Sequence, residues 1–442
     1  MKYSQFNSIV SFNNKYHLYN SFTQKFIIID TLLKDLLESA MIEGVEGLED
    51  VHPDFYLYLK SEEFIIPDKI NEVEKVKELV KNVDGNIHNF LLTINPTMNC
   101  NFKCWYCYET HIKKSSFSSN MIERVGYFIE KTTKKKDMHH FNLAFFGGEP
   151  LLYFKRDVIP IIKKLQQECV KNLVDYSVGF TTNGYLINDE FIKFFKSHKI
   201  TPSLQITLDG YKEKHDSVRY VSANKGSYEV IVNNIKKLLI NSFHVRLRIN
   251  YTSENISDAY KIADEFDDVS LEIKKEFLLV DLHRVWQDSK NDDILIIVEK
   301  VIDKFKEKNM PVQHMVPNNV HDSCYADKRN SVTINYNGDL FKCTARDFLT
   351  TSRVGYLDEG GDLVWENNHL EKRMDIKFKN KPCLTCRLLP ICNGGCSQHA
   401  LDAFEDGEKE YCIFYGDEKL KDDVIVSKVK EIIEPLLELN EV

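Results

Sequence analysis

Short apolar runs alternate with amphipathic stretches through the middle of this 442-residue chain. We expect strands where β-branched and aromatic residues cluster, and helices where apolar residues recur every three or four positions. The expected strands are 90–95, 142–146, 177–181, 203–208, 245–251 and 269–279. The expected helices are 119–133, 154–170, 189–197, 227–240 and 257–265. Strands that alternate with helices form parallel sheets with right-handed crossovers, so the pattern predicts an α/β fold of six units.

Six such units suit an open, partial (β/α)6 TIM-like barrel, whose functional residues gather at the carboxyl ends of the strands. Before it, the apolar runs 8–12, 15–19 and 25–29 predict strands, and a helix begins at Asp30 or Thr31. Small strands with short helices indicate a winged-helix-like module. The expected domains are the module (1–85), the barrel (86–315), a cysteine-rich domain (316–416) and a closing helix (417–442). That helix carries an apolar face made by Ile425, Val426, Val429, Ile432 and Ile433.

Charge and hydropathy exclude two classes of partner. The net charge of −9 speaks against nucleic acid, which usually requires a basic face. No apolar stretch reaches the ~18 residues that a membrane span needs, and the start of the chain lacks the apolar core of a secretory signal. We therefore expect a cytoplasmic protein with no membrane partner. Eleven cysteines in that compartment indicate metal or redox chemistry rather than disulfides.

Three of these cysteines follow the first expected barrel strand directly. Cys100, Cys104 and Cys107 have the spacing CX3CX2C. Three thiolates hold three corners of a tetrahedral site, whereas a structural zinc or a closed iron–sulfur cluster takes four ligands. This run, with Tyr106 before its last cysteine, resembles the cluster loop of radical S-adenosylmethionine (SAM) enzymes. The resemblance implies a 4Fe–4S cluster whose open iron binds SAM, and reductive cleavage of SAM to a 5′-deoxyadenosyl radical that abstracts a substrate hydrogen.

A second motif ends the next expected strand, where Gly147, Gly148 and Glu149 precede Pro150. Alone, such a run is most often a plain turn from strand to helix. One strand after the three cysteines, it resembles the Gly-Gly-Glu-Pro motif of the same family, which implies contacts to the SAM ammonium.

Two further motifs end the third and fourth expected strands. They are Thr181-Thr-Asn-Gly184 and Thr207-Leu-Asp-Gly210, the second followed by His215, Asp216 and Arg219. Both resemble family motifs, although a Ser is more usual in place of Thr207. The resemblance implies ribose and carboxylate contacts from Thr182, Asn183, Thr207 and Arg219, and we expect His215 and Asp216 to brace the loop. Arg246, Arg248 and Asn250 share one face of the fifth strand, but alternation does not decide whether that face lies inside the barrel.

A second set of cysteines lies near the C-terminus. A CX2C pair alone would most often indicate zinc. The order and spacing of these seven C-terminal cysteines, however, resemble the SPASM extension of radical SAM enzymes, which holds two auxiliary 4Fe–4S clusters. Three 4Fe–4S clusters are then expected in total. The resemblance implies one auxiliary cluster with four cysteine ligands and one with only three. The eleventh cysteine of the chain, Cys169, is expected to be a buried apolar residue. The closed set is Cys383, Cys386, Cys392 and Cys412, and the three-cysteine set is Cys324, Cys343 and Cys396.

The three-cysteine set leaves its fourth position open. Asp347 or His399 could supply that ligand, or an open iron could bind a substrate cysteine thiolate, because soft sulfur suits iron.

Nearly the whole chain resembles maturases of ribosomally synthesised peptides (RiPPs). That resemblance implies a ribosomal precursor peptide whose leader adds a strand to the N-terminal module. It also implies an electron donor such as flavodoxin or ferredoxin, and a thioether or another side-chain cross-link as product. In the alternative, the N-terminal module is only a cap on the barrel.

Two other functions fit the sequence less well. An anaerobic sulfatase-maturating enzyme would carry Asp where Thr344 stands, and an eighth auxiliary cysteine between Cys324 and Cys343. A non-catalytic electron-transfer protein would leave the three glycine-containing motifs unexplained.

Overall fold

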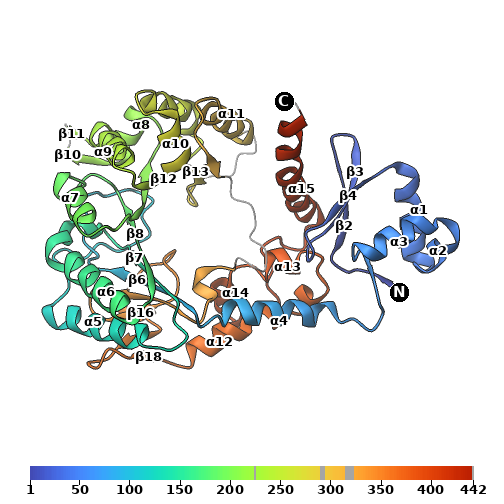
Figure 1. The fold of residues 1–442 in the computed structure, drawn as a ribbon, viewed down its shortest axis with the longest axis horizontal. Helices are drawn as coiled ribbons and strands as arrows, with labels where there is room; N and C mark the ends of the chain where they lie inside the picture. Colours follow the sequence, from blue (N-terminus) through green and yellow to red (C-terminus); the bar gives the residue numbers. More distant parts are fainter. Residues whose placement is uncertain (223–224, 289–293, 314–322, 441–442) are drawn as a thin grey trace. The chain divides into compact units, whose positions relative to one another are not determined.

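The computed structural model describes residues 1–222, 225–288, 294–313 and 323–440. The chain forms two compact units (Figure 1). The barrel unit comprises residues 87–315 and 330–368, and the terminal unit comprises 1–86, 316–329 and 369–442. The four-part division expected above stays a prediction.

The barrel unit is built on one sheet of eleven strands, in the order β14-β13-β12-β9-β8-β7-β6-β15-β16-β17-β18. Neighbours from β14 to β15 are parallel, and those from β15 to β18 are antiparallel. The largely parallel α/β sheet is therefore confirmed, with β14 and β15 flanking five strands that match expected ones and β13. The strands are β6 Asn89–Asn95, β7 His140–Phe145, β8 Asp175–Thr182, β9 Ser203–Leu208, β12 His244–Tyr251, β13 Leu278–Arg284, β14 Val312–Gln313, β15 Ser331–Asn335, β16 Asp339–Phe341, β17 Gly355–Leu357 and β18 Leu363–Trp365.

Helices connect the parallel strands and begin where short polar side chains cap them. Ser118 accepts a hydrogen bond from Met121 N at the start of α5, and Asn188 does the same for Phe191 N at the start of α7. The helices are α5 Ser119–Thr133, α6 Ile159–Asn172, α7 Asp189–Ser197, α8 Lys212–Val218, α9 Tyr228–Ile240, α10 Leu271–Phe277 and α11 Ile294–Glu307. Other elements are the 3-10 helices η1 Pro150–Tyr153, η3 Ile256–Phe266 and η5 Thr350–Ser352, the π-helix η2 Phe154–Val158, and the antiparallel pair β10 Tyr220–Ser222 and β11 Lys225–Gly226.

The expected strand 269–279 is wrong. The Ser270 side chain caps a helix by accepting from Ile273 N, and α10 takes the next seven residues. Strand β13 begins only at Leu278. The apolar residues of 269–279 therefore belong first to helix α10 and then to strand β13, and the alternation of apolar residues alone did not separate the two.

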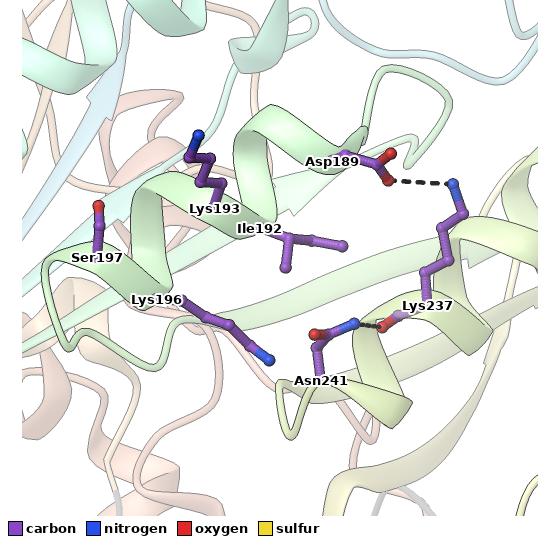
Figure 2. Close-up of a pocket in the computed structure, with 7 residues that line it drawn as sticks. All are labelled: Asp189, Ile192, Lys193, Lys196, Ser197, Lys237 and Asn241. Carbon is purple, nitrogen blue, oxygen red and sulfur yellow. Dashed lines mark hydrogen bonds and ion pairs between the residues drawn. The ribbon is translucent and has the colours of Figure 1, made fainter.

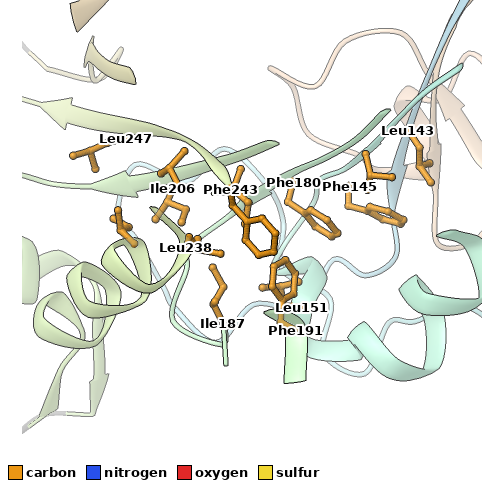
Figure 3. Close-up of a cluster of buried hydrophobic side chains, with 14 of the residues drawn as sticks. Leu143, Phe145, Leu151, Phe180, Ile187, Phe191, Ile206, Leu238, Phe243 and Leu247 are labelled. Atoms are coloured by element: carbon orange, nitrogen blue, oxygen red, sulfur yellow. The ribbon is translucent and has the colours of Figure 1, made fainter. Parts of the chain in front are cut away.

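The core of the barrel unit lies between the sheet and its helices (Figure 3). The Phe180 ring from β8 lies 5.1 Å from that of Phe145 on β7 and 5.6 Å from that of Phe191 on α7, between ring centroids. Cys169 is fully buried in this core, as expected.

The opposite face of the sheet is polar. On β12, Val245, Leu247 and Ile249 are buried, while Arg246 and Arg248 alternate with them and stay partly exposed. The arginine face is therefore the inner face of the sheet, which settles the choice that alternation left open.

The terminal unit begins with an antiparallel sheet in the order β2-β3-β4. Asp30 is the N-cap of α1 and accepts from Leu33 N at 2.8 Å. The elements are β1 Lys2–Tyr3, β2 Asn7–Phe12, β3 Lys15–Asn20, β4 Phe26–Ile29, α1 Thr31–Glu43, α2 Gly47–Val51, α3 Pro53–Ser61, β5 Ile65–Ile66 and α4 Glu72–Asp84.

Short elements and one long helix make up the C-terminal part of this unit. The short elements are η4 Tyr325–Asp327, α12 His369–Asp375, η6 Ile376–Phe378, η7 Lys381–Thr385, α13 Leu389–Cys392 and α14 Ser397–Glu405, and the long helix is α15 Glu418–Asn440. Ile425 and Val429 of α15 are fully buried against Val10, Tyr19 and Leu388. The apolar face expected for the closing helix is confirmed, while residues 441–442 lie outside the described part.

A buried ion-pair network joins α4 to the C-terminal part of the terminal unit. The carboxylate of Asp84 lies 2.6 Å from Lys377 Nζ and accepts a hydrogen bond from Ser323. Lys377 also lies 3.3 Å from Asp327, which pairs with Arg373 at 3.2 Å. Since removing one charge from such a network leaves another buried and unpaired, the network fixes these segments against one another.

None of the helices in the described parts of the chain is long and apolar enough to cross a membrane.

Candidate functional site

The barrel residues singled out by the sequence lie at the carboxyl ends of successive strands. The cysteine loop, residues 96–118, follows β6, and the Gly-Gly-Glu turn follows β7. Thr182 ends β8, and Thr207 lies one residue before the end of β9. Because the strands are parallel, these motifs meet at one edge of the sheet.

The Gly-Gly-Glu turn packs directly against the cysteine loop. Glu149 N donates to Asn99 O at 2.9 Å, and Gly148 N donates to Glu109 Oε2 at 2.6 Å. At Gly148, where φ is +50°, a Cβ would lie 2.3 Å from Asn99 O. Only glycine allows this approach, so the turn holds the loop on both sides of its cysteines.

The Glu149 carboxylate is fully buried and accepts three hydrogen bonds. Its Oε1 accepts from Leu151 N at 2.9 Å and from Thr182 Oγ1 at 2.8 Å, and its Oε2 accepts from Asn183 N at 2.8 Å. Burial raises the pKa of Glu149, while these donors and the charge of Arg219 oppose the rise. Three donors around the group match its ionised form. In this structure the carboxylate ties the end of β7 to the end of β8, and its expected contact with SAM stays a prediction.

The end of β8 also reaches the cysteine loop. Asn183 Nδ2 donates to Asn101 Oδ1 at 2.8 Å, and the rings of Phe102 and Tyr185 meet edge to face with centroids 5.7 Å apart. Asn183, one of the residues expected to contact the ribose or carboxylate of SAM, therefore helps to hold the loop beside Cys100.

A buried network that the sequence did not reveal joins the loop to the fourth and fifth strands. Arg219 Nε donates to Asp209 Oδ2 at 2.6 Å, and Arg219 Nη2 donates to the Tyr106 hydroxyl at 2.7 Å. That hydroxyl donates to Asp209 Oδ1 at 2.6 Å and accepts from Asn250 Nδ2 at 3.2 Å. Tyr106 and Asn250 lie 144 positions apart, so no local pattern could have predicted their contact.

His215 and Asp216 brace this region, as expected. The buried His215 ring accepts a hydrogen bond from Asp209 N at 3.2 Å through Nδ1, and its Nε2 forms a hydrogen bond with Ser227 Oγ at 3.0 Å. The Asp216 carboxylate accepts from Ser227 N at 2.7 Å and Tyr228 N at 2.9 Å, at the start of α9.

The three thiols of the loop form one electrostatic group. Burial raises the pKa of Cys100 to about 12 and that of Cys107 to about 11, and the charge of Cys104 adds to both. The charge of Arg219 acts on all three thiols in the opposite direction and favours thiolates. Within the residues described, no three His, Cys, Asp or Glu side chains are arranged to hold a single metal ion. Three thiols in one loop, beside a buried cation, suit a larger thiolate-bound group such as an iron–sulfur cluster.

The far side of the loop is tied to the segment that carries Cys343. Thr110 N donates to Asp347 Oδ1 at 2.8 Å, and the Tyr108 hydroxyl donates to Thr344 O at 2.8 Å. Asp347, one of the two expected candidates for a cluster ligand, therefore binds the cysteine loop in this structure.

Glu109 lies on the same side of the cysteine loop. Burial raises the pKa of Glu109 to about 7, and the hydrogen bond from Gly148 N opposes the rise. An acidic residue two positions after the last loop cysteine was the sequence feature that could have drawn attention to it.

Four of the C-terminal cysteines gather in the terminal unit. Burial raises the pKa of Cys392 to about 12, and the charges of Cys383, Cys386 and Cys412 add to this rise. Asn380 Nδ2 donates to Cys383 Sγ at 2.9 Å. These four are the set expected to hold a closed cluster. Cys324 and Cys396 belong to the same unit and Cys343 to the barrel unit, so the grouping of these three stays a prediction.

A separate open hollow lies on the helical side of the barrel, between α7 and α9 (Figure 2). It is lined by Lys193, Lys196 and Lys237, and Lys237 pairs with Asp189 at 3.3 Å. None of the residues expected to bind SAM lines it, so it is not the candidate site.

Comparison with known proteins identifies the class. Residues 94–266 match the model of the radical SAM superfamily. That range contains the cysteine loop, the Gly-Gly-Glu turn and the Arg219 network, so the barrel carries a radical SAM domain and the chain is a radical SAM enzyme. The fold and the class of enzyme expected from the sequence are thereby confirmed.

Three known proteins are similar to this chain over most of its length. A cysteine-type anaerobic sulfatase-maturating enzyme from Clostridium novyi is 26% identical over 355 residues, which cover 71% of this chain and 88% of that protein. The structure of Streptococcus suis SuiB bound to precursor peptide SuiA has a TM-score of 0.51 at 16% identity and covers 93% of this chain and 98% of that one. The structure of anSMEcpe with bound AdoMet and Cp18Cys peptide has a TM-score of 0.53 at 18% identity and covers 70% of this chain and 89% of that one.

Proposed function

We propose that this enzyme modifies a ribosomal precursor peptide by abstracting a side-chain hydrogen and forming a thioether or another cross-link. The observation that carries the proposal is a cysteine loop braced at the carboxyl edge of a polar-lined barrel. It occurs in a chain that covers 98% of SuiB, whose structure was solved with a precursor peptide.

The loop cysteines Cys100, Cys104 and Cys107 would hold a 4Fe–4S cluster. When bound, the cluster and SAM supply a 5′-deoxyadenosyl radical that abstracts the hydrogen. The protein's part is to position the cofactor and exclude water. The turn made by Gly147, Gly148 and Glu149 would contact the ammonium group of SAM. The residues proposed for the ribose and carboxylate of SAM are Thr182, Asn183, Thr207 and Arg219.

Two auxiliary clusters would complete a set of three. The mutual electrostatic influence of Cys383, Cys386, Cys392 and Cys412 supports the closed one. The other would use Cys324, Cys343 and Cys396 with a non-cysteine fourth position. An electron donor such as flavodoxin or ferredoxin would supply the reducing electron.

The N-terminal part of the terminal unit would bind the leader of the precursor peptide. Strands β2 and β4 are the outer strands of its three-stranded sheet, and an outer strand offers unpaired backbone groups for an added strand. A cap on the barrel remains the alternative role for this module.

Sulfatase maturation is the second candidate, favoured by the Clostridium novyi relative. Thr344 in place of Asp, and no cysteine between Cys324 and Cys343, oppose it.

The test is anaerobic reconstitution, followed by assays of iron content, SAM cleavage and peptide mass. Replacing Cys100, Cys104 and Cys107 by Ala should remove about one third of the iron and all SAM cleavage, since one of three clusters is lost. Cys169→Ala is the matched control, because this buried cysteine lies outside every proposed ligand set. Full SAM cleavage by the triple variant would refute the proposed radical chemistry.

Substrate class is tested on the same preparation. A precursor peptide encoded beside the gene should lose the mass of the hydrogens removed, and a cysteine-containing sulfatase peptide should stay unchanged. Formylglycine in the sulfatase peptide would instead establish the second candidate.

A further inference from the structure

The four cysteines expected to hold the closed auxiliary cluster come from two segments of the terminal unit. Cys383, Cys386 and Cys392 lie close together in the sequence, on η7 and α13 and the turn between them. Cys412 lies instead on the irregular segment 406–417, between α14 and α15. A site built from both segments needs a contact that holds Cys412 beside the other three.

One buried side chain, that of Asn380, makes such a contact. Asn380 Oδ1 accepts a hydrogen bond from Tyr411 N at 3.1 Å, and Asn380 Nδ2 donates to Tyr411 O. Among the described residues, the backbone of Tyr411 has no other hydrogen-bond partner. Because Tyr411 directly precedes Cys412, the Asn380 amide fixes the point from which Cys412 enters the site.

The same amide also contacts a thiol of the other segment. Asn380 Nδ2 donates to Cys383 Sγ at 2.9 Å. The nitrogen carries two hydrogens, so it can serve the sulfur and Tyr411 O together, while Oδ1 serves Tyr411 N. The reverse orientation would turn Oδ1 toward two acceptors, so these partners determine which end of the amide faces the thiol. Asn380 is only 3% exposed, and a hydrogen bond that is shielded from water is electrostatically stronger.

We propose that Asn380 is a positioning residue of the closed auxiliary cluster, which joins Cys412 to the other three ligands and stabilises the reduced cluster through its hydrogen bond to Cys383. Groups that hydrogen-bond to ligands orient them and tune the site. Hydrogen bonds to the sulfurs help to set the reduction potential of an iron–sulfur cluster, because they favour its more negative, reduced form. The inference rests on the proposed function, since it presupposes a cluster on these four cysteines.

The first experiment measures amide hydrogen exchange of the reconstituted holoenzyme by mass spectrometry under anaerobic conditions. Asn380→Leu removes all three hydrogen bonds at similar volume and without a change of charge. Exchange in residues 410–413 should become roughly tenfold faster or more, because Tyr411 N loses its acceptor. The Tyr411 side chain still packs against Ile376 and Leu401, so the variant should remain folded, which its melting temperature checks.

The second experiment is a redox titration of the holoenzyme with dithionite, followed by electron paramagnetic resonance. The signal of the closed cluster is the one that Cys383→Ala removes, and the signal of the loop cluster is the one that SAM alters. Asn380→Leu should make reduction of the closed cluster about tenfold less favourable, the effect of losing one hydrogen bond to a charged group. For a one-electron step this lowers the potential by about 59 mV. The potential of the loop cluster should not change.

Two further variants complete the titration. Asn380→Gln keeps the amide and should recover part of the shift in potential. It also supplies the potential if Asn380→Leu fails to assemble the closed cluster and loses about one third of the iron, a result that itself supports the positioning role. Thr385→Val is the matched control, because this exposed hydroxyl lies between Cys383 and Cys386 but donates to Pro382 O at 3.4 Å and not to a thiol.

The outcomes separate this inference from the proposed function. If Asn380→Leu has all three clusters and changes neither exchange in residues 410–413 nor the potential of the closed cluster, the assignment of Asn380 is overturned while the proposed function stands. Faster exchange with an unchanged potential overturns the role of the bond to Cys383. If both change but no precursor peptide is modified, the peptide function fails and the Asn380 assignment survives. A wild-type holoenzyme without a cluster on these four cysteines overturns both the inference and the proposed set of three clusters.

Discussion

Replacing Glu149 by Gln separates a bracing role from a contact with SAM. The carboxylate accepts from Leu151 N, Thr182 Oγ1 and Asn183 N. A Gln side chain offers one oxygen, which can still accept from Leu151 N and Thr182 Oγ1. Its NH2 group then faces Asn183 N–H, so two donors meet in a site that excludes water.

The size of the effect follows from these contacts. Losing one buried hydrogen bond to a charged acceptor costs about 1.5–3 kcal/mol, and the two retained bonds weaken because the acceptor is neutral. We expect a loss of about 2–4 kcal/mol in the free energy of unfolding of the barrel unit. For a domain of this size that lowers the melting temperature by roughly 4–16 °C. Because the turn holds the cysteine loop, the iron bound after reconstitution should also fall.

Differential scanning calorimetry and iron analysis test this expectation, with Glu123→Gln on the exposed side of α5 as the control. An unchanged melting temperature and full iron content, together with weaker SAM binding, would refute the bracing role. That result would instead support a direct contact of the Glu149 carboxylate with the SAM ammonium.

Three further variants test other features. Lys377→Met should destabilise the terminal unit by about 3–5 kcal/mol in urea unfolding, because it leaves the buried carboxylate of Asp84 without its cation. Phe191→Ala should lower the stability of the barrel unit by about 3–5 kcal/mol in the same assay, because its fully packed ring leaves a cavity. Tyr108→Phe should lower stability by only about 0.5–1.5 kcal/mol, yet speed amide hydrogen exchange in the cysteine loop, because it removes the bond to Thr344 O.

The controls are neighbouring residues that lack the contact under test. Lys379→Met removes an exposed lysine two positions from Lys377 and should leave unfolding unchanged. Val170→Ala, on the exposed side of α6, should cost far less than Phe191→Ala. If Tyr108→Phe does not alter hydrogen exchange in residues 100–111, the bond to Thr344 does not hold the loop.

Strands with a strong local pattern were predictable, whereas a helix that runs directly into a strand, as α10 into β13, was not separated from it. The 203–208 strand was predicted to the residue because Ile206 and Leu208 alternate within a run that turns bound on both sides. The segment 269–279 did not reveal its helix, since a serine before apolar residues, such as Ser270, occurs in strand turns as well as at helix caps.

Some features of the candidate site could likewise be predicted from the sequence, and others could not. The loop cysteines and the Gly-Gly-Glu turn were visible because each motif is contiguous. The Arg219–Asp209–Tyr106 network was not, because its members come from three segments that only the folded sheet brings together. The burial of the Glu149 carboxylate also depends on the neighbouring strand and could not be deduced from its own motif.

The bonds from Tyr108 to Thr344 and from Thr110 to Asp347 have a consequence for mutational studies. They join the segment that follows Cys107 to the segment that follows Cys343, so disorder in one segment is transmitted to the other. A Cys343 variant that loses activity would therefore not identify that cysteine as an electron relay or a substrate ligand. Its SAM affinity must first be shown to be intact, because the same variant can disable the cofactor loop at a distance.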